Sequence, residues 1–118
     1  MNNLYILDGR NPVPCRDLLT WGRWFQKADR HVAVDHIGPM MVSTVFLGLD
    51  HNYSAKGPPI LFETMILDGG DHEFQRRYAT WAEAERGHVV ALRLARRWLY
   101  RAEQAMLEFP AVRKFTSE

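Results

Sequence analysis

Residues 31 to 49 read HVAVDHIGPMMVSTVFLGL, and this stretch decides the fold. It holds two runs of strand-forming residues, 31 to 37 and 40 to 49, which Gly38 and Pro39 separate. Valine favours strands and a Gly-Pro pair favours a turn, so we predict a β-hairpin. A third apolar run, 60 to 67, is short enough to be another strand, and the polar residues 50 to 59 form the loop before it.

The N-terminal part predicts a strand and a short helix. Residues 5 to 7 are an apolar run that Asp8 and Gly9 end as a turn, and residues 11 to 14 (NPVP) are expected to be a loop. Asp17 can then cap a helix over residues 18 to 29, whose apolar residues recur every three or four positions.

The C-terminal part predicts a turn over residues 68 to 73, an edge strand over 74 to 78 and one long helix over 80 to 109. Thr80 and Glu83 form a capping box at its start, and Pro110 stops it, leaving 110 to 118 as a loose tail. Gly87 either kinks this helix or lets another segment pack closely against it.

This order of elements predicts the α+β class, with an antiparallel sheet of three to five strands packed with a short N-terminal helix and a long C-terminal helix. The 118 residues fit a single domain, 1–118. The net charge of +1 argues against a protein that coats nucleic acid or membrane. One cysteine, no signal peptide and no long apolar span indicate a protein of the cytoplasm.

Two features of the long helix suggest partners. An apolar stripe at heptad spacing runs from His88 to Phe109 and is either core or a seam for self-association. We expect a homo-oligomer whose interface includes four residues: Leu92, Trp98, Leu99 and Met106. Five arginines also lie between Glu85 and Glu103 with no acid among them, and they form either a solvated face or a binding site for an anion.

Catalytic and metal signatures are absent from the sequence. The five histidines have no metal-ligand spacing, Cys15 lacks an activating neighbour, and no phosphate-binding or dinucleotide fingerprint occurs. His31 and Asp35 would share a strand face, although a chance pairing explains them as well. Glu63 lies within an apolar strand, so it is either at an edge or paired. We therefore expect no enzyme, no metal and no cofactor.

Several segments carry a resemblance to a known family. The stretches STVFLGLDH (43–51), LFETM (61–65) and TWAEAERGH (80–88) resemble a widespread family of small uncharacterised proteins from tailed phages and prophages. This chain departs from many members by continuing well past His88. The architecture also resembles the Thoeris anti-defence sponges, which are compact oligomers that sequester cyclic nucleotide or cyclic ADP-ribose signals. Both resemblances imply a phage protein acting in the host cytoplasm.

The resulting hypothesis is a non-enzymatic phage protein that sequesters a phosphate-bearing cyclic nucleotide or cyclic ADP-ribose signal of host immunity. Arginines suit the phosphates, aromatic rings suit a base, and polar loop residues add further contacts. The candidate ligand-binding residues are Arg76, Arg77, Arg93, Arg97, Trp81, Phe74, His51 and Asn52. The alternatives are an inhibitor of a host defence complex and a small nucleic-acid-binding protein, although the near-zero net charge makes nucleic acid an unfavourable partner.

Overall fold

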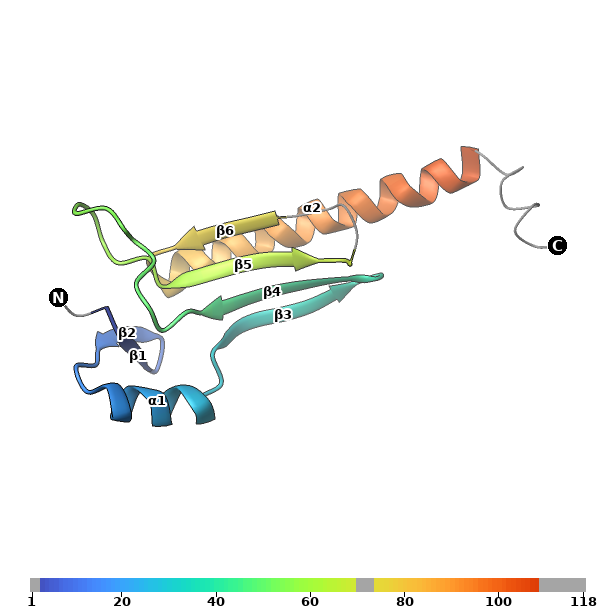
Figure 1. Cartoon of the computed structure of the whole chain (residues 1–118). Coiled ribbons are helices and arrows are strands. Elements are labelled where there is room, and N and C mark those ends of the chain that lie inside the picture. The colour runs from blue at the N-terminus through green and yellow to red at the C-terminus, as the bar shows by residue number, and fades with distance from the viewer. Residues whose placement is uncertain (1–2, 70–73, 109–118) are drawn as a thin grey trace.

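The computed structural model describes residues 3–69 and 74–108, and it confirms the α+β class (Figure 1). The elements are β1 (Tyr5–Asp8), β2 (Asn11–Pro14), α1 (Leu18–Lys27), β3 (His31–Ile37), β4 (Met40–Phe46), β5 (Phe62–Leu67), β6 (Phe74–Tyr78) and α2 (Trp81–Glu108). β3 to β6 form a four-stranded antiparallel sheet in chain order, and β1 and β2 form a separate two-stranded ribbon. The predicted hairpin is therefore the β3–β4 pair.

The sequence interpretation of residues 11 to 14 as a loop was wrong, because they form β2. Gly9 adopts a positive φ of 63° in a two-residue turn, which brings Asn11 opposite Asp8. Pro12 and Pro14 pair with Leu7 and Tyr5, which are the non-hydrogen-bonded positions of such a hairpin. The prolines therefore remove no ladder hydrogen bond.

The main core lies between the sheet and α2. Alternate residues of β4 and β5 point at the helix, and Met40, Val42 and Ile66 pack against Ala91 and Ala95. A second cluster, formed by Phe46, Leu61, Phe62 and Ala84, joins the start of α2 to the sheet. Tyr5, Leu7 and Trp24 cover that cluster, so the N-terminal elements close one end of the core.

α1 is anchored by hydrogen bonds at its start and along its inner side. The Asp17 carboxylate accepts from the Thr20 hydroxyl and the Leu19 N–H, and these two bonds lower the pKa of Asp17. The Trp21 indole N–H donates to the carbonyls of Tyr5 and Gly48 at 3.0 and 3.1 Å. The helix ends at Lys27, two residues before the predicted end.

The other side of the four-stranded sheet is uncovered. We define the open sheet face as the outward residues of β3, β4, β5 and β6: His31, Val34, His36, Met41, Ser43, Val45, Glu63, Met65, Leu67, Gln75 and Arg77. None of them belongs to either core cluster of the described chain. The uncovered face of such a sheet usually carries polar residues, and here five of the eleven residues are apolar.

A register shift in β3 changes which residues share a strand face. His31 pairs with Val45, whereas Ala33 pairs with Thr44, so the alternation breaks between them. The expectation that His31 and Asp35 share a face was therefore wrong. His31 instead bonds Asp29 at 3.1 Å, and Asp35 turns toward α2.

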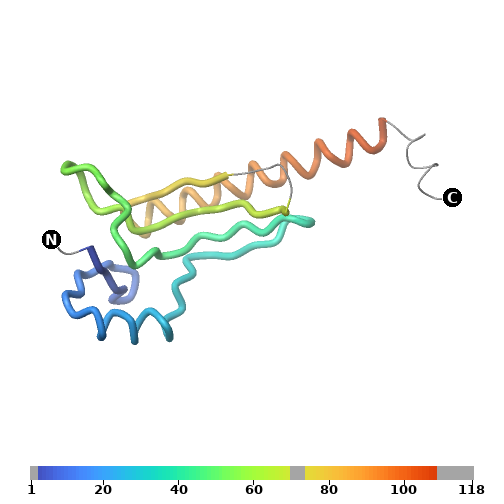
Figure 2. The backbone as a smooth tube through the Cα atoms, viewed as in Figure 1, coloured from blue at the N-terminus to red at the C-terminus, as the bar shows by residue number. Residues whose placement is uncertain are grey.

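α2 continues past the sheet. Every described residue from Tyr100 onward is exposed, and Figures 1 and 2 show this end of the helix projecting beyond the β3–β4 turn. Gly87 serves close packing, because a Cβ at this position would overlap the ring and hydroxyl of Tyr78 in β6. The predicted tail, residues 110 to 118, lies outside the described residues.

Candidate functional site

A buried line of polar side chains connects the sheet to α2. Thr64 and Thr44 hydroxyl oxygens lie 2.6 Å apart, Thr44 Oγ1 lies 2.7 Å from His88 Nδ1, and His88 Nε2 lies 2.8 Å from Asp35 Oδ2. With Nε2 protonated, His88 donates to Asp35 and accepts from Thr44, which accepts from Thr64. Each donor in the line then has an acceptor.

This line has the order of a hydroxyl, a base and an orienting carboxylate, which is the order of a nucleophilic catalytic site. Its accessibility excludes that role, because both threonines are 0% exposed and His88 is 4% exposed. Only Asp35 reaches solvent, with about half of its side chain exposed. A substrate therefore cannot reach the hydroxyl, and we interpret the line as a structural network.

The exposed arginines of α2 form a group of charged residues that make no ion pairs with other described residues. We call Arg86, Arg93, Arg96, Arg97 and Arg101 the arginine face; all five are exposed, and none forms an ion pair with a described residue. Arg93, Arg97 and Arg101 follow one another by four residues, so they repel each other by a few tenths of a kcal/mol per pair. An anionic partner would relieve this repulsion.

The two candidate arginines of β6 do not form one site. Neighbouring residues of a strand point to opposite sides, and Arg77 lies on the open sheet face, where its Nε donates to Glu63 at 2.9 Å. Gln75 donates to the same carboxylate at 2.7 Å, so Glu63 is paired within the sheet. Arg76 lies on the helix side and covers the ring of Phe74 at 5.3 Å.

The two candidate stacking residues are partly buried and pack against the core. Phe74 packs against the cluster of Met40, Val42 and Ile66, and Trp81 meets Phe62 edge-on at 6.1 Å. The Arg10 guanidinium lies 5.4 Å from the Trp81 ring. Because these rings already have partners, only the parts of them that stay exposed are open to a base.

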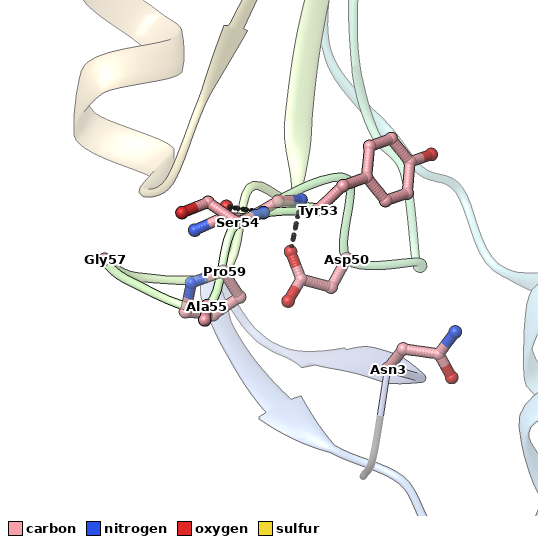
Figure 3. Close-up of a pocket in the computed structure, with 8 residues that line it drawn as sticks. Asn3, Asp50, Tyr53, Ser54, Ala55, Gly57 and Pro59 are labelled. Atoms are coloured by element: carbon pink, nitrogen blue, oxygen red, sulfur yellow. Dashed lines mark hydrogen bonds between the residues drawn. The ribbon is translucent and has the colours of Figure 1, made fainter.

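The remaining two ligand candidates, His51 and Asn52, stabilise the 50–59 loop. His51 Nδ1 bonds the Leu49 carbonyl at 2.8 Å, and the Asn52 amide donates to the carbonyls of Lys56 and Pro58. The loop borders a hollow of about 560 Å³, shown in Figure 3, that Asn3 faces from the N-terminal segment. Its lining is Asn3, Asp50, Asn52, Tyr53, Ser54, Ala55, Gly57 and Pro59. Since this lining offers a carboxylate and no cationic side chain, the hollow suits an anion poorly.

Three of the four predicted interface residues are partly buried and pack against the chain's own core. Leu92, Trp98 and Leu99 pack against the cluster around Ala91 and Ala95, and Leu99 contacts the α-carbon region of Gly38. Met106 is 59% exposed on the projecting part of α2. A contact with a second copy through Leu92, Trp98 or Leu99 would have to use the part of each side chain that stays exposed.

Searches of the described residues add two findings. They contain no group of three His, Cys, Asp or Glu side chains suited to a metal ion, and no helix in them is long and apolar enough to cross a membrane. Comparison of the chain with protein-family models, with curated proteins and with solved structures finds no match.

Proposed function

We propose that this chain is a non-enzymatic binding protein that holds a phosphate-bearing partner on the arginine face of α2. The observation that supports this proposal is the gathering of five exposed arginines on one side of α2, where none of them forms an ion pair with a described residue. Guanidinium groups bind phosphate oxygens in pairs of hydrogen bonds, and a repeat of four residues aligns several of them along one anion.

The partner proposed first is a cyclic nucleotide or cyclic ADP-ribose signal of host immunity, sequestered by a phage protein in the host cytoplasm. The phosphate contacts are assigned to Arg93 and Arg97, with Arg76 at the neighbouring edge of the sheet. The contacts of Arg77, Phe74 and Trp81 argue for leaving them out of this site.

The test is calorimetry with cyclic nucleotides and cyclic ADP-ribose isomers. We expect the Arg93→Glu/Arg97→Glu variant to bind at least about a hundredfold more weakly, because each charge-assisted hydrogen bond contributes about 1.5–3 kcal/mol. The matched control is Arg16→Glu/Arg23→Glu, which makes the same charge change at exposed residues near α1 and should bind normally. Failure of the wild-type protein to bind any ligand of the panel would contradict the proposal.

The second candidate function is inhibition of a host defence complex through a protein contact, and the open sheet face favours it. Met41, Val45 and Met65 line the centre of this face, and Val34 and Leu67 at its margin are 41% and 43% exposed. Exposed apolar patches on small proteins commonly mark contact surfaces.

A substitution on the open sheet face separates this second function from the first. We expect Met65→Lys to abolish capture of a specific host protein from lysate, because it places a charge in the centre of the apolar patch. Arg93→Glu/Arg97→Glu should capture that protein normally. Equal capture by wild type and Met65→Lys, with both folded by circular dichroism, would exclude this face as the contact surface.

A further inference from the structure

The outer side of α2 carries a second heptad stripe that is distinct from the buried one. Its members alternate at spacings of four and three residues and are all exposed: Val89, Arg93, Arg96, Tyr100, Glu103 and Leu107. Val89, Tyr100 and Leu107 are large hydrophobic residues with exposures of 46%, 63% and 62%. The buried residues of α2, which include Ala84, His88, Ala91 and Ala95, lie on the opposite side. The stripe therefore has the spacing of a helix seam and no partner within the described chain.

We propose that this outer stripe is the contact between two copies of the chain, with the two α2 helices packed antiparallel. In one antiparallel register all six positions find complementary neighbours. Arg93 lies opposite the partner's Glu103, Arg96 opposite the partner's Tyr100, and Val89 opposite the partner's Leu107. Two-fold symmetry makes each of these contacts twice.

The charges of the stripe select this orientation. A parallel pair in register would place Arg93 against the partner's Arg93 and Glu103 against the partner's Glu103, which is repulsive at both layers. The antiparallel register converts both layers into ion pairs, and it lays each Arg96 guanidinium beside a tyrosine ring. Of these two arrangements, only the antiparallel one combines contacts between opposite charges with contacts between apolar residues.

The fold leaves room for this pairing. Each sheet lies on the inner side of its own α2, so two copies would stack as sheet, helix, helix and sheet. The pairing also gives the projecting end of α2 a neighbour, because Leu107 would lie on Val89 of the partner. The argument for this pairing does not use the proposed anion binding, although both proposals use Arg93. Arg86, Arg97 and Arg101 remain outside the stripe.

Charge exchange tests the pairing. We expect sedimentation analysis to show a two-chain species for the wild type. We expect Arg93→Glu and Glu103→Arg each to raise the dissociation constant of this dimer at least about tenfold. The combined variant Arg93→Glu/Glu103→Arg restores both ion pairs and should recover the wild-type constant. Arg23→Glu on α1 is the charge-matched control.

Three results would overturn the inference: a wild-type protein that stays a single chain at high micromolar concentration, single variants that associate normally, or an exchanged variant that fails to recover. Circular dichroism of each variant shows whether it is folded. Anion binding by a single-chain wild-type protein would remove this inference and leave the proposed function standing.

Cysteine crosslinking tests the register. A mixture of Val89→Cys and Leu107→Cys chains should form a disulfide between residues 89 and 107 on oxidation, and Val89→Cys chains alone should not. The native Cys15 is buried and stays in place. Efficient crosslinking of Val89→Cys chains to each other would indicate a parallel pair and overturn the proposal.

Discussion

Gly87→Ala is expected to destabilise the protein by about 2 kcal/mol or more, although alanine is the better helix former. In an open helix interior this substitution stabilises by about 1 kcal/mol. Here the added methyl group would overlap the Tyr78 ring and hydroxyl, because β6 packs directly on the α-carbon of Gly87. Forcing extra volume into a packed site typically costs about 1–3 kcal/mol, and displacing the tyrosine would also lose its buried area. Urea denaturation followed by circular dichroism measures the difference.

Gly22→Ala is the matched control for this prediction. Gly22 also lies inside a helix, and a Cβ there would have no atom within 4 Å. The same change should therefore leave the free energy of unfolding unchanged or raise it by up to about 1 kcal/mol. If Gly87→Ala were as stable as Gly22→Ala, the close packing of β6 on α2 would be wrong.

The fold could be predicted from the sequence wherever the signal was local. The pair of runs in residues 31 to 49 specified the β3–β4 hairpin, and Thr80 with Glu83 specified the start of α2. The Thr80 hydroxyl accepts from the Glu83 N–H as expected, and it also donates to the Glu83 carboxylate. β2 was missed because Pro12 and Pro14 disfavour strands, yet a two-residue turn places them where no ladder hydrogen bond is needed. The β3 shift left no local signal, so the face of His31 was misassigned.

The candidate site was harder to predict, because the contacts of its side chains involve residues that are distant in the sequence. Arg77 resembles Arg76 in the sequence, but only the pairing of β5 with β6 brings it to Glu63. The buried polar line did leave a signal. Thr44 and Thr64 interrupt apolar strands at positions that face the helix, and His88 interrupts the apolar stripe of α2. Buried polar groups need partners, so these three residues could have been matched to one another.

That buried line gives the second large expected effect. His88→Ala should destabilise the protein by about 3 kcal/mol or more, because it opens a cavity and leaves the Thr44 hydroxyl with one partner fewer. Asp35→Ala should cost less, since about half of the Asp35 side chain is exposed and water can replace it at the edge of the network. Urea denaturation of the two variants gives this order directly.

The triple variant Thr44→Val/Thr64→Val/His88→Leu decides whether the line is structural. If the line only pairs buried polar groups with one another, removing all three should recover most of the stability that His88→Ala loses. No buried hydroxyl or imidazole is then left unpaired, and water can hydrate the half-exposed Asp35 carboxylate. Binding by the arginine face should persist in this variant, since those side chains lie on the other side of α2. A triple variant that folds stably but loses ligand binding would assign the line a functional role that its burial argues against.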